Sequence, residues 1–184
     1  MARHKHKRRT RRRQRVQRSA DAPLRARTRR HRVHRGGHVP DSLKVVVQSG
    51  AAAGPEGAAD TPLFTKEETR QQPAVSWVRN RPADLYTLVC VDPDAPGPNA
   101  PWLHWLVANC AGEGVASGEV VVPWAPPTPP SGTHRYIFKL YRQAGAGPVD
   151  MSDVVRERPA FPLEGLVAEK GLVQVDSKEY RVAA

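Results

Sequence analysis

Three short strings in the middle of this 184-residue chain constrain its fold more than any other feature. They are DPDAP at residues 92–96, WLHW at 102–105 and GTHRY at 132–136. Side chains along a strand alternate between its two faces, so His134 and Tyr136 project to one side and Arg135 to the other. Trp102 and His104 share a face in the same way. We therefore expect two histidines and a tyrosine to converge beside the acidic turn, at the mouth of one sheet.

The segments around these strings are rich in β-branched and aromatic residues and are bounded by glycine and proline, which predicts strands. Their connections are short or proline-rich, and this favours antiparallel pairing. A capping box between Thr65 and Glu68 predicts a helical turn, and a helix over 163–170 should end at Gly171. The predicted strands are the end of 39–47, then 72–77, 86–91, 105–109, 118–122, 135–142 and 178–182.

The three strings and their order resemble the signature of the phosphatidylethanolamine-binding protein family. The resemblance covers about 39–182 and is strongest over 86–143. It implies a mainly β (α+β) fold, in which a large antiparallel sheet is joined by a smaller sheet and a few short peripheral helices. It also implies one small anion-binding pocket. The ligand-binding residues implied by the resemblance are Asp92, Asp94, Pro96, Trp102, His104, Pro129, His134 and Tyr136.

The chemistry of these residue types suits a phosphate-like or carboxylate anion. An imidazole can donate a hydrogen bond from either nitrogen, and the hydroxyl of Tyr136 adds a neutral donor. Asp92 repels an anion unless one of the two carries a proton or the carboxylate pairs with an imidazolium. A phosphomonoester, whose second pKa lies near ~6, can supply that proton. The expected ligand is therefore a phospholipid headgroup, a nucleotide or a phosphorylated partner.

The rim of the expected pocket is rich in proline, which favours a site formed before the ligand binds. Residues 125–132 read APPTPPSG, a spacing that resembles the plant members of the family. The loop over 97–101 is shorter than is usual in the family, and we predict a cis bond between Ala100 and Pro101. The chain ends at Ala184 without the C-terminal helix of the animal members, so we expect a more open pocket.

Charge divides the chain into two parts. Residues 1–38 hold 16 Lys and Arg against one acidic residue, whereas 39–184 hold 13 basic and 17 acidic residues. The first part has almost no apolar side chains and cannot bury enough surface to order itself alone. We therefore predict a disordered Arg/His-rich tail over 1–38 and one domain over 39–184.

The tail has several interpretations. The alternatives are a solvated tail, a nuclear or nucleolar localisation signal, a segment that binds nucleic acid, and a mitochondrial presequence. A presequence also needs an apolar helical face, which this segment lacks, so the nuclear or RNA-related interpretations are favoured.

No apolar run approaches the ~18 residues of a membrane span. Nor does an apolar signal core follow the basic N-terminus. Cys90 and Cys110 lie in apolar contexts, as buried thiols in a reducing compartment do, and this is favoured over a disulfide. We expect an intracellular protein, cytoplasmic or nuclear or both, with no transmembrane segment.

Two other site chemistries compete for the same residues. Two histidines and two aspartates could coordinate Zn²⁺ or Mn²⁺, but the spacing from Asp92 to His134 fits no compact ligand motif. A hydrolase needs a nucleophile, and Ser131 lacks the Gly-x-Ser-x-Gly context. We therefore expect no catalytic residues, no metal and no cofactor.

Two functions remain open, because a shared fold does not settle function. The first is a monomeric binding or regulatory protein that recognises a phosphate-bearing ligand and modulates signalling, with a protein partner as a further option. The alternative is a structural ribonucleoprotein component, of the kind found in the mitochondrial ribosome, that binds nucleic acid through residues 1–38.

Overall fold

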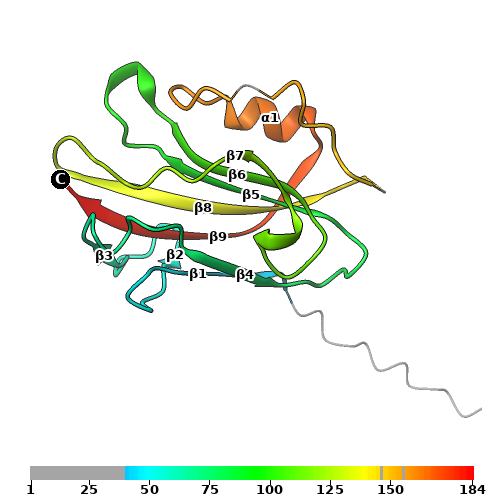
Figure 1. The fold of residues 1–184 in the computed structure, drawn as a ribbon, viewed down its shortest axis with the longest axis horizontal. Helices are drawn as coiled ribbons and strands as arrows, with labels where there is room; N and C mark the ends of the chain where they lie inside the picture. Colours follow the sequence, from blue (N-terminus) through cyan, green and yellow to red (C-terminus); the bar gives the residue numbers. More distant parts are fainter. Residues whose placement is uncertain (1–39, 146, 155) are drawn as a thin grey trace, which may run out of the picture. The chain divides into compact units, whose positions relative to one another are not determined.

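The structure is a computed structural model that describes residues 40–184 apart from 146 and 155 (Figure 1). The predicted tail over 1–38 lies outside the described residues. Strands dominate the described part, and its helices are short. The strands are β1 (Ser42–Val46), β2 (Gly54–Pro55), β3 (Leu63–Phe64), β4 (Ala74–Val78), β5 (Tyr86–Asp92), β6 (Trp102–Cys110), β7 (Glu119–Val122), β8 (Thr133–Gln143) and β9 (Leu172–Ala183). The helices are the 3₁₀ turns η1 (Gly97–Asn99) and η2 (Val115–Ser117) and the α-helix α1 (Leu163–Glu169).

Within the described residues, the strands form one sheet of seven and one of two. The large sheet has the order β2-β9-β8-β5-β6-β7, with β3 also beside β9, and the small sheet pairs β1 with β4. The pairs are antiparallel except β3 with β9, which run parallel. The predicted fold class, a large antiparallel sheet with a smaller sheet and short helices, is confirmed.

Both faces of the large sheet are covered, which creates two cores. The small sheet packs on one face, and α1 with the segment before it packs on the other (Figure 1). Alternation along β8 supplies both cores, because Phe138 belongs to the first and Ile137 to the second. The central strand β5 is buried along its whole length, as expected for a strand covered on both faces.

Local signals placed several elements correctly. The predicted capping box is present, since the Thr65 amide donates to the Glu68 carboxylate at 2.8 Å and the Glu68 amide donates to the Thr65 hydroxyl at 3.2 Å. The predicted helix is α1, and Gly171 follows it with a φ of +62°, a left-handed conformation that favours glycine. The last strand was predicted too short, because β9 begins at Leu172 and pairs with the full length of β8.

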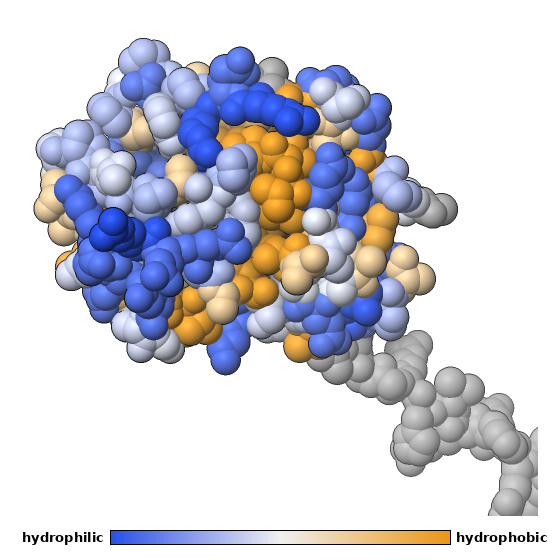
Figure 2. All heavy atoms as spheres, viewed as in Figure 1, coloured by the Kyte–Doolittle hydropathy of each residue, from blue (hydrophilic) through white to orange (hydrophobic). Residues whose placement is uncertain are grey.

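The surface of the described part mixes hydrophilic residues with a band of hydrophobic ones that crosses the face in Figure 2. The large hydrophobic side chains that are exposed include Val120, which lies on the edge strand β7. The helices among residues 40–184, leaving aside 146 and 155, are too short or too polar to cross a membrane.

A candidate anion-binding pocket

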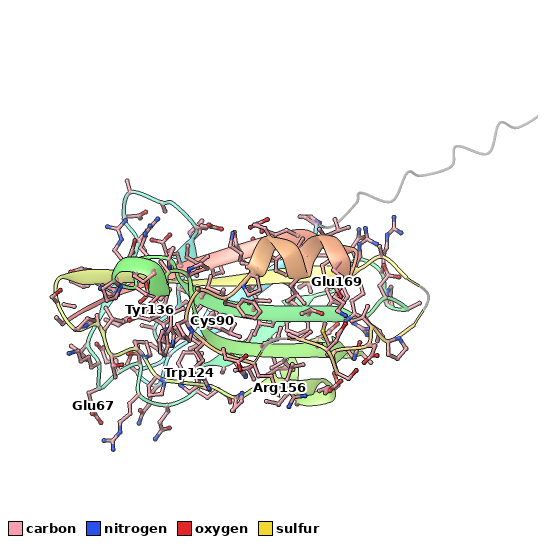
Figure 3. All side chains as sticks on the ribbon, turned by 90° about the horizontal axis from the view of Figure 1, so that it is seen from above. Glu67, Cys90, Trp124, Tyr136, Arg156 and Glu169 are labelled. Atoms are coloured by element: carbon pink, nitrogen blue, oxygen red, sulfur yellow. The ribbon has the colours of Figure 1, made fainter. Side chains whose placement is uncertain are left out.

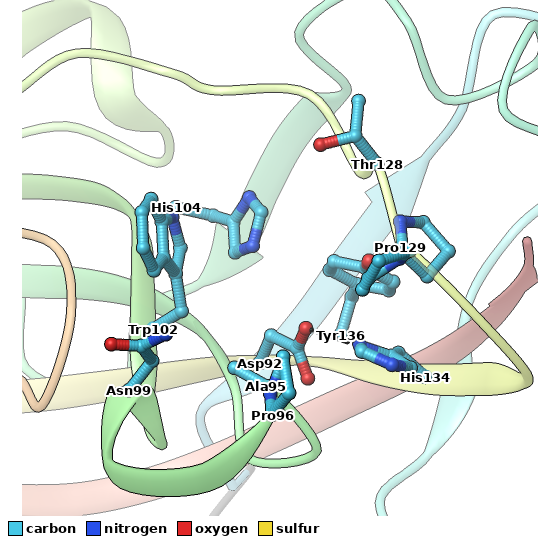
Figure 4. A pocket seen from close by; sticks show the side chains of 11 residues that line it. Asp92, Ala95, Pro96, Asn99, Trp102, His104, Thr128, Pro129, His134 and Tyr136 are labelled. Carbon is cyan, nitrogen blue, oxygen red and sulfur yellow. Dashed lines mark hydrogen bonds and ion pairs between the residues drawn. The ribbon is translucent and has the colours of Figure 1, made fainter.

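The structure brings seven of the eight predicted site residues to one pocket of about 230 Å³ (Figure 4). The pocket opens where β5 ends and β6 and β8 begin, beside the proline-rich segment after β7. Four of the lining residues were not predicted from the sequence, because their side chains do not by themselves indicate a binding site. Their place in the pocket is known only from the fold. The lining residues are Asp92, Ala95, Pro96, Asn99, Trp102, His104, Thr128, Pro129, Pro130, His134 and Tyr136.

A buried charge-assisted hydrogen bond forms the floor of the pocket. His134 Nδ1 lies 2.7 Å from Asp92 Oδ2, and the two residues are only 7% and 4% exposed. The other carboxylate oxygen, Oδ1, accepts a 2.7 Å hydrogen bond from the backbone amide of Asp94. Because a carboxylate accepts and does not donate, His134 Nδ1 carries the hydrogen and Nε2 is left for a ligand.

Asp94, which the resemblance implies to be a ligand-binding residue, does not line the pocket. Its carboxylate accepts hydrogen bonds from the guanidinium of Arg135 at 2.8 and 2.6 Å and from the Arg135 amide at 2.9 Å. The Arg135 hydrogen bonds are the main cause that lowers the pKa of Asp94. Adjacent residues on β8 point to opposite faces, so Arg135 holds Asp94 away from the pocket that His134 faces.

A β-bulge in β6 places Trp102 and His104 in the pocket. Cys90 pairs with Trp105 and Val91 with Leu103, so His104 is an extra residue with no partner on β5. In a regular strand Trp105 and Leu103 would share a face, but here they belong to different cores. The bulge therefore lets Trp105 fill the core while His104 still faces the pocket.

His104 has a defined tautomer. Its Nδ1 lies 2.7 Å from the carbonyl oxygen of Ala125, and a carbonyl only accepts, so Nδ1 carries the hydrogen. Burial is the main cause that lowers the pKa of His104, and it outweighs the opposing effects of the Ala125 hydrogen bond and the Asp92 charge. At neutral pH the ring is therefore uncharged, and its Nε2 lone pair is directed to the pocket side (Figure 4).

Tyr136 supplies a protonated hydroxyl at the back of the pocket. Its ring stacks on Tyr180 with centroids 5.7 Å apart and meets the His104 ring edge-on at 5.0 Å. Burial and the nearby Asp92 charge raise the pKa of Tyr136, so the hydroxyl remains a donor throughout the physiological range.

The short loop before β6 follows the sequence prediction. The peptide bond between Ala100 and Pro101 is cis, as predicted. In the proline-rich segment, Pro127 and Pro129 are buried whereas Thr128 and Pro130 are exposed, so alternate residues anchor this segment.

The predicted thiols Cys90 and Cys110 are buried and unbonded to each other, and burial raises the pKa of both.

In the described part of the chain, no group of three or more His, Cys, Asp or Glu residues is arranged to hold a metal ion. Asp94, one of the four residues considered, is bound to Arg135.

Comparison with known proteins identifies the family. The model of the phosphatidylethanolamine-binding protein family matches residues 49–175. The chain is 40% identical over 108 residues to the 26 kDa secreted antigen of Toxocara canis, and the matched stretch covers 53% of this chain and 41% of the antigen. It is 38% identical over 112 residues to Protein MOTHER of FT and TFL1 homolog 2 of Oryza sativa subsp. japonica, covering 58% of this chain and 64% of that protein. The chain thus spans less than two thirds of the length of these two relatives.

Solved structures agree on the fold. The carboxypeptidase Y inhibitor, in a complex with its cognate proteinase, matches with a TM-score of 0.64 and 21% identity over 77% of this chain and 82% of the inhibitor. At this identity the likeness concerns the fold alone. The resemblance in the sequence is confirmed by the family match, which covers most of the described residues. The chain belongs to the phosphatidylethanolamine-binding protein family.

Proposed function

We propose that this chain is a binding and regulatory protein whose pocket holds the phosphate group of a phosphomonoester. The observation that carries the proposal is the buried Asp92–His134 pair at 2.7 Å, set beside a neutral His104 and the Tyr136 hydroxyl. These groups come from three strands of one sheet.

The donors and acceptors of the pocket match a phosphate that carries one proton. Tyr136 donates to one phosphate oxygen, and His134 is available through Nε2. His104 Nε2 accepts, so the phosphate O–H has a partner there. Both oxygens of Asp92 already accept hydrogen bonds from protein donors, which reduces the repulsion that a free carboxylate would exert on the ligand.

The walls suit a ligand with an apolar or carbon-rich part next to the phosphate. Trp102, Pro96 and Pro129 present ring surfaces to a volume of about 230 Å³. That volume lies below the usual range of pockets for drug-sized molecules, about 300–1,000 Å³. We infer that the pocket takes the phosphate and its nearest substituent, while the rest of a phospholipid, nucleotide or phosphorylated protein stays outside.

The regulatory part of the proposal rests on the family rather than on the pocket. One structural relative is named as a proteinase inhibitor in complex with its proteinase, so the fold can engage a protein partner. We propose that this chain likewise acts by binding, without catalysis, and that ligand occupancy modulates a protein partner.

The test is a titration of the full chain with O-phosphorylethanolamine and with a phosphotyrosine peptide, followed by calorimetry and NMR. His134→Ala should abolish saturable binding, because it removes the group that pairs with Asp92. Lys44→Ala is the matched control, since Lys44 is exposed on β1 of the small sheet. Failure of the folded wild-type chain to bind either probe would refute the pocket proposal.

The charge of residues 1–38 favours a second candidate function, RNA binding in a ribonucleoprotein. Its test is a filter-binding titration with RNA at two salt concentrations. Affinity that falls with salt and disappears on deletion of 1–38, while anion binding persists, would support it.

A further inference from the structure

Arg158, in the segment before α1, binds backbone carbonyls of two segments close to the pocket. Its Nη1 donates to the carbonyl oxygens of Leu103 at 3.0 Å and His104 at 3.1 Å, and its Nη2 donates to that of Pro123 at 2.9 Å. The carbonyl oxygen of Arg158 accepts a 2.8 Å hydrogen bond from the Leu103 amide. One residue therefore connects the start of β6 to the start of the proline-rich segment.

Two of the three acceptors, the carbonyls of Leu103 and His104, lie at the bulge in β6. A bulge leaves its extra residue unpaired, and a buried carbonyl without a partner is costly. The His104 carbonyl instead accepts from Arg158 and, at 2.9 Å, from the Ala125 amide. The planar fork of a guanidinium can reach three carbonyls at once, which the single ammonium of lysine cannot do in the same geometry.

The same contacts determine how the His104 ring is presented. His104 and Ala125 form a reciprocal pair, because His104 Nδ1 donates to the Ala125 carbonyl and the Ala125 amide donates to the His104 carbonyl. Arg158 holds the backbone of His104 on one side and that of Pro123, two residues before Ala125, on the other. The Ala125 carbonyl selects the tautomer of His104, and Arg158 contacts the backbone that carries this reciprocal pair.

We propose that Arg158 is a positioning residue of the anion pocket, which keeps the β6 bulge in place and the His104 ring in the tautomer that directs Nε2 to the ligand. The ligand part of this inference rests on the proposed function. Arg158 itself does not line the pocket.

The Arg158 charge also acts on His104. Burial is the main cause that lowers the pKa of His104, and the Arg158 and His134 charges act in the same direction. The Asp92 charge and the Ala125 hydrogen bond oppose them. Removal of the Arg158 charge should therefore raise the pKa of His104.

The test uses the full chain and three variants, Arg158→Met, Arg158→Lys and the control Arg156→Met. Arg156 is exposed and lies well away from Tyr136 (Figure 3). For each protein, NMR gives the tautomer of His104 from its ring nitrogen shifts and the pKa of His104 from a pH titration. Calorimetry gives the Kd for O-phosphorylethanolamine.

Arg158→Met should mix the two tautomers of His104, raise its pKa and weaken O-phosphorylethanolamine binding about tenfold, the lower end of the effect when a partner that orients a ligating side chain is removed. Arg158→Lys should keep the lowered pKa but still mix the tautomers and weaken binding. Arg156→Met should match the wild type in all three measurements.

Unchanged ring nitrogen shifts together with a Kd within twofold of the wild type in Arg158→Met would overturn the inference. If thermal unfolding shows that this variant is not folded, Arg158→Lys decides by the same criterion. If the wild-type chain binds no O-phosphorylethanolamine, the proposed function fails, but the ring shifts of His104 still test the positioning role separately.

Discussion

Phosphate binding should depend on pH through one shared proton. The neutral His104 ring carries its hydrogen on Nδ1, which donates to Ala125, so a phosphate dianion would meet a lone pair at Nε2. The other polar groups that line the pocket here include Asp92, His134 and Tyr136, and the Arg158 guanidinium donates to the His104 carbonyl. The contact between His104 Nε2 and a phosphate oxygen therefore requires an added proton on one of the two.

The size of the effect follows from the ligand. A phosphomonoester with a second pKa near ~6 is about half monoanion at pH 6 and about 1% monoanion at pH 8. If one proton must accompany it, the Kd rises about 50-fold over this range, or about 2.3 kcal/mol. A complex of protonated His104 with the phosphate dianion contains the same number of protons as a complex of neutral His104 with the monoanion. The change of Kd with pH therefore does not depend on which partner carries the proton.

The assay is calorimetry of O-phosphorylethanolamine at pH 6, 7 and 8, in buffers of different ionisation enthalpy so that proton uptake is counted directly. His104→Gln is the informative variant, because an amide offers a permanent donor to a dianion and should flatten the pH dependence. Saturable wild-type binding with a Kd that stays within twofold between pH 6 and pH 8 would refute the shared proton.

Three predictions concern stability, each measured by urea unfolding. Asp94→Asn should lower the free energy of unfolding by about 1–2 kcal/mol at pH 7, a value reduced because the Arg135 pair is partly exposed. Folding lowers the pKa of Asp94, so its contribution to stability is fully present at a pH above the pKa of the unfolded chain and is lost as the pH falls through the pKa of the folded protein. An equal difference in unfolding free energy between Asp94→Asn and the wild type at pH 7 and at pH 3 would contradict this. Gly118→Ala should lower the free energy of unfolding by about 3 kcal/mol, because the new Cβ would lie 2.4 Å from Cys110 Sγ. A decrease below about 0.5 kcal/mol would show that the surrounding residues move to accept the methyl group. Gly165→Ala in α1 should instead stabilise by up to about 1 kcal/mol, since its Cβ meets only an ordinary contact at 3.9 Å; destabilisation would show that this reasoning fails.

Much of the fold could be predicted from local patterns. β-branched runs bounded by glycine and proline located the central strands, and alternation along β8 correctly separated His134 and Tyr136 from Arg135. The pocket residues came from the family resemblance, because no local pattern says that residues 92 and 134 meet. The strings were informative because they end or begin the strands that line the pocket.

The remaining features depend on contacts between distant backbone groups, which the sequence does not display. Nothing in the regular-looking segment Trp102–Cys110 marks a bulge at His104. Arg158 lies 54 residues from His104 and binds carbonyl oxygens, which every residue possesses. Asp92 and Asp94 looked equivalent until the structure gave one to His134 and the other to Arg135.

The division of tasks within these two neighbouring pairs has an evolutionary consequence. Asp92 and His134 face the pocket, while Asp94 and Arg135 hold the same turn to the same strand from the outer side. The turn thus keeps one attachment to β8 when the inner pair is substituted. Under the proposed function, ligand preference can therefore diverge by substitution at residues 92 and 134 without loss of the architecture that presents them.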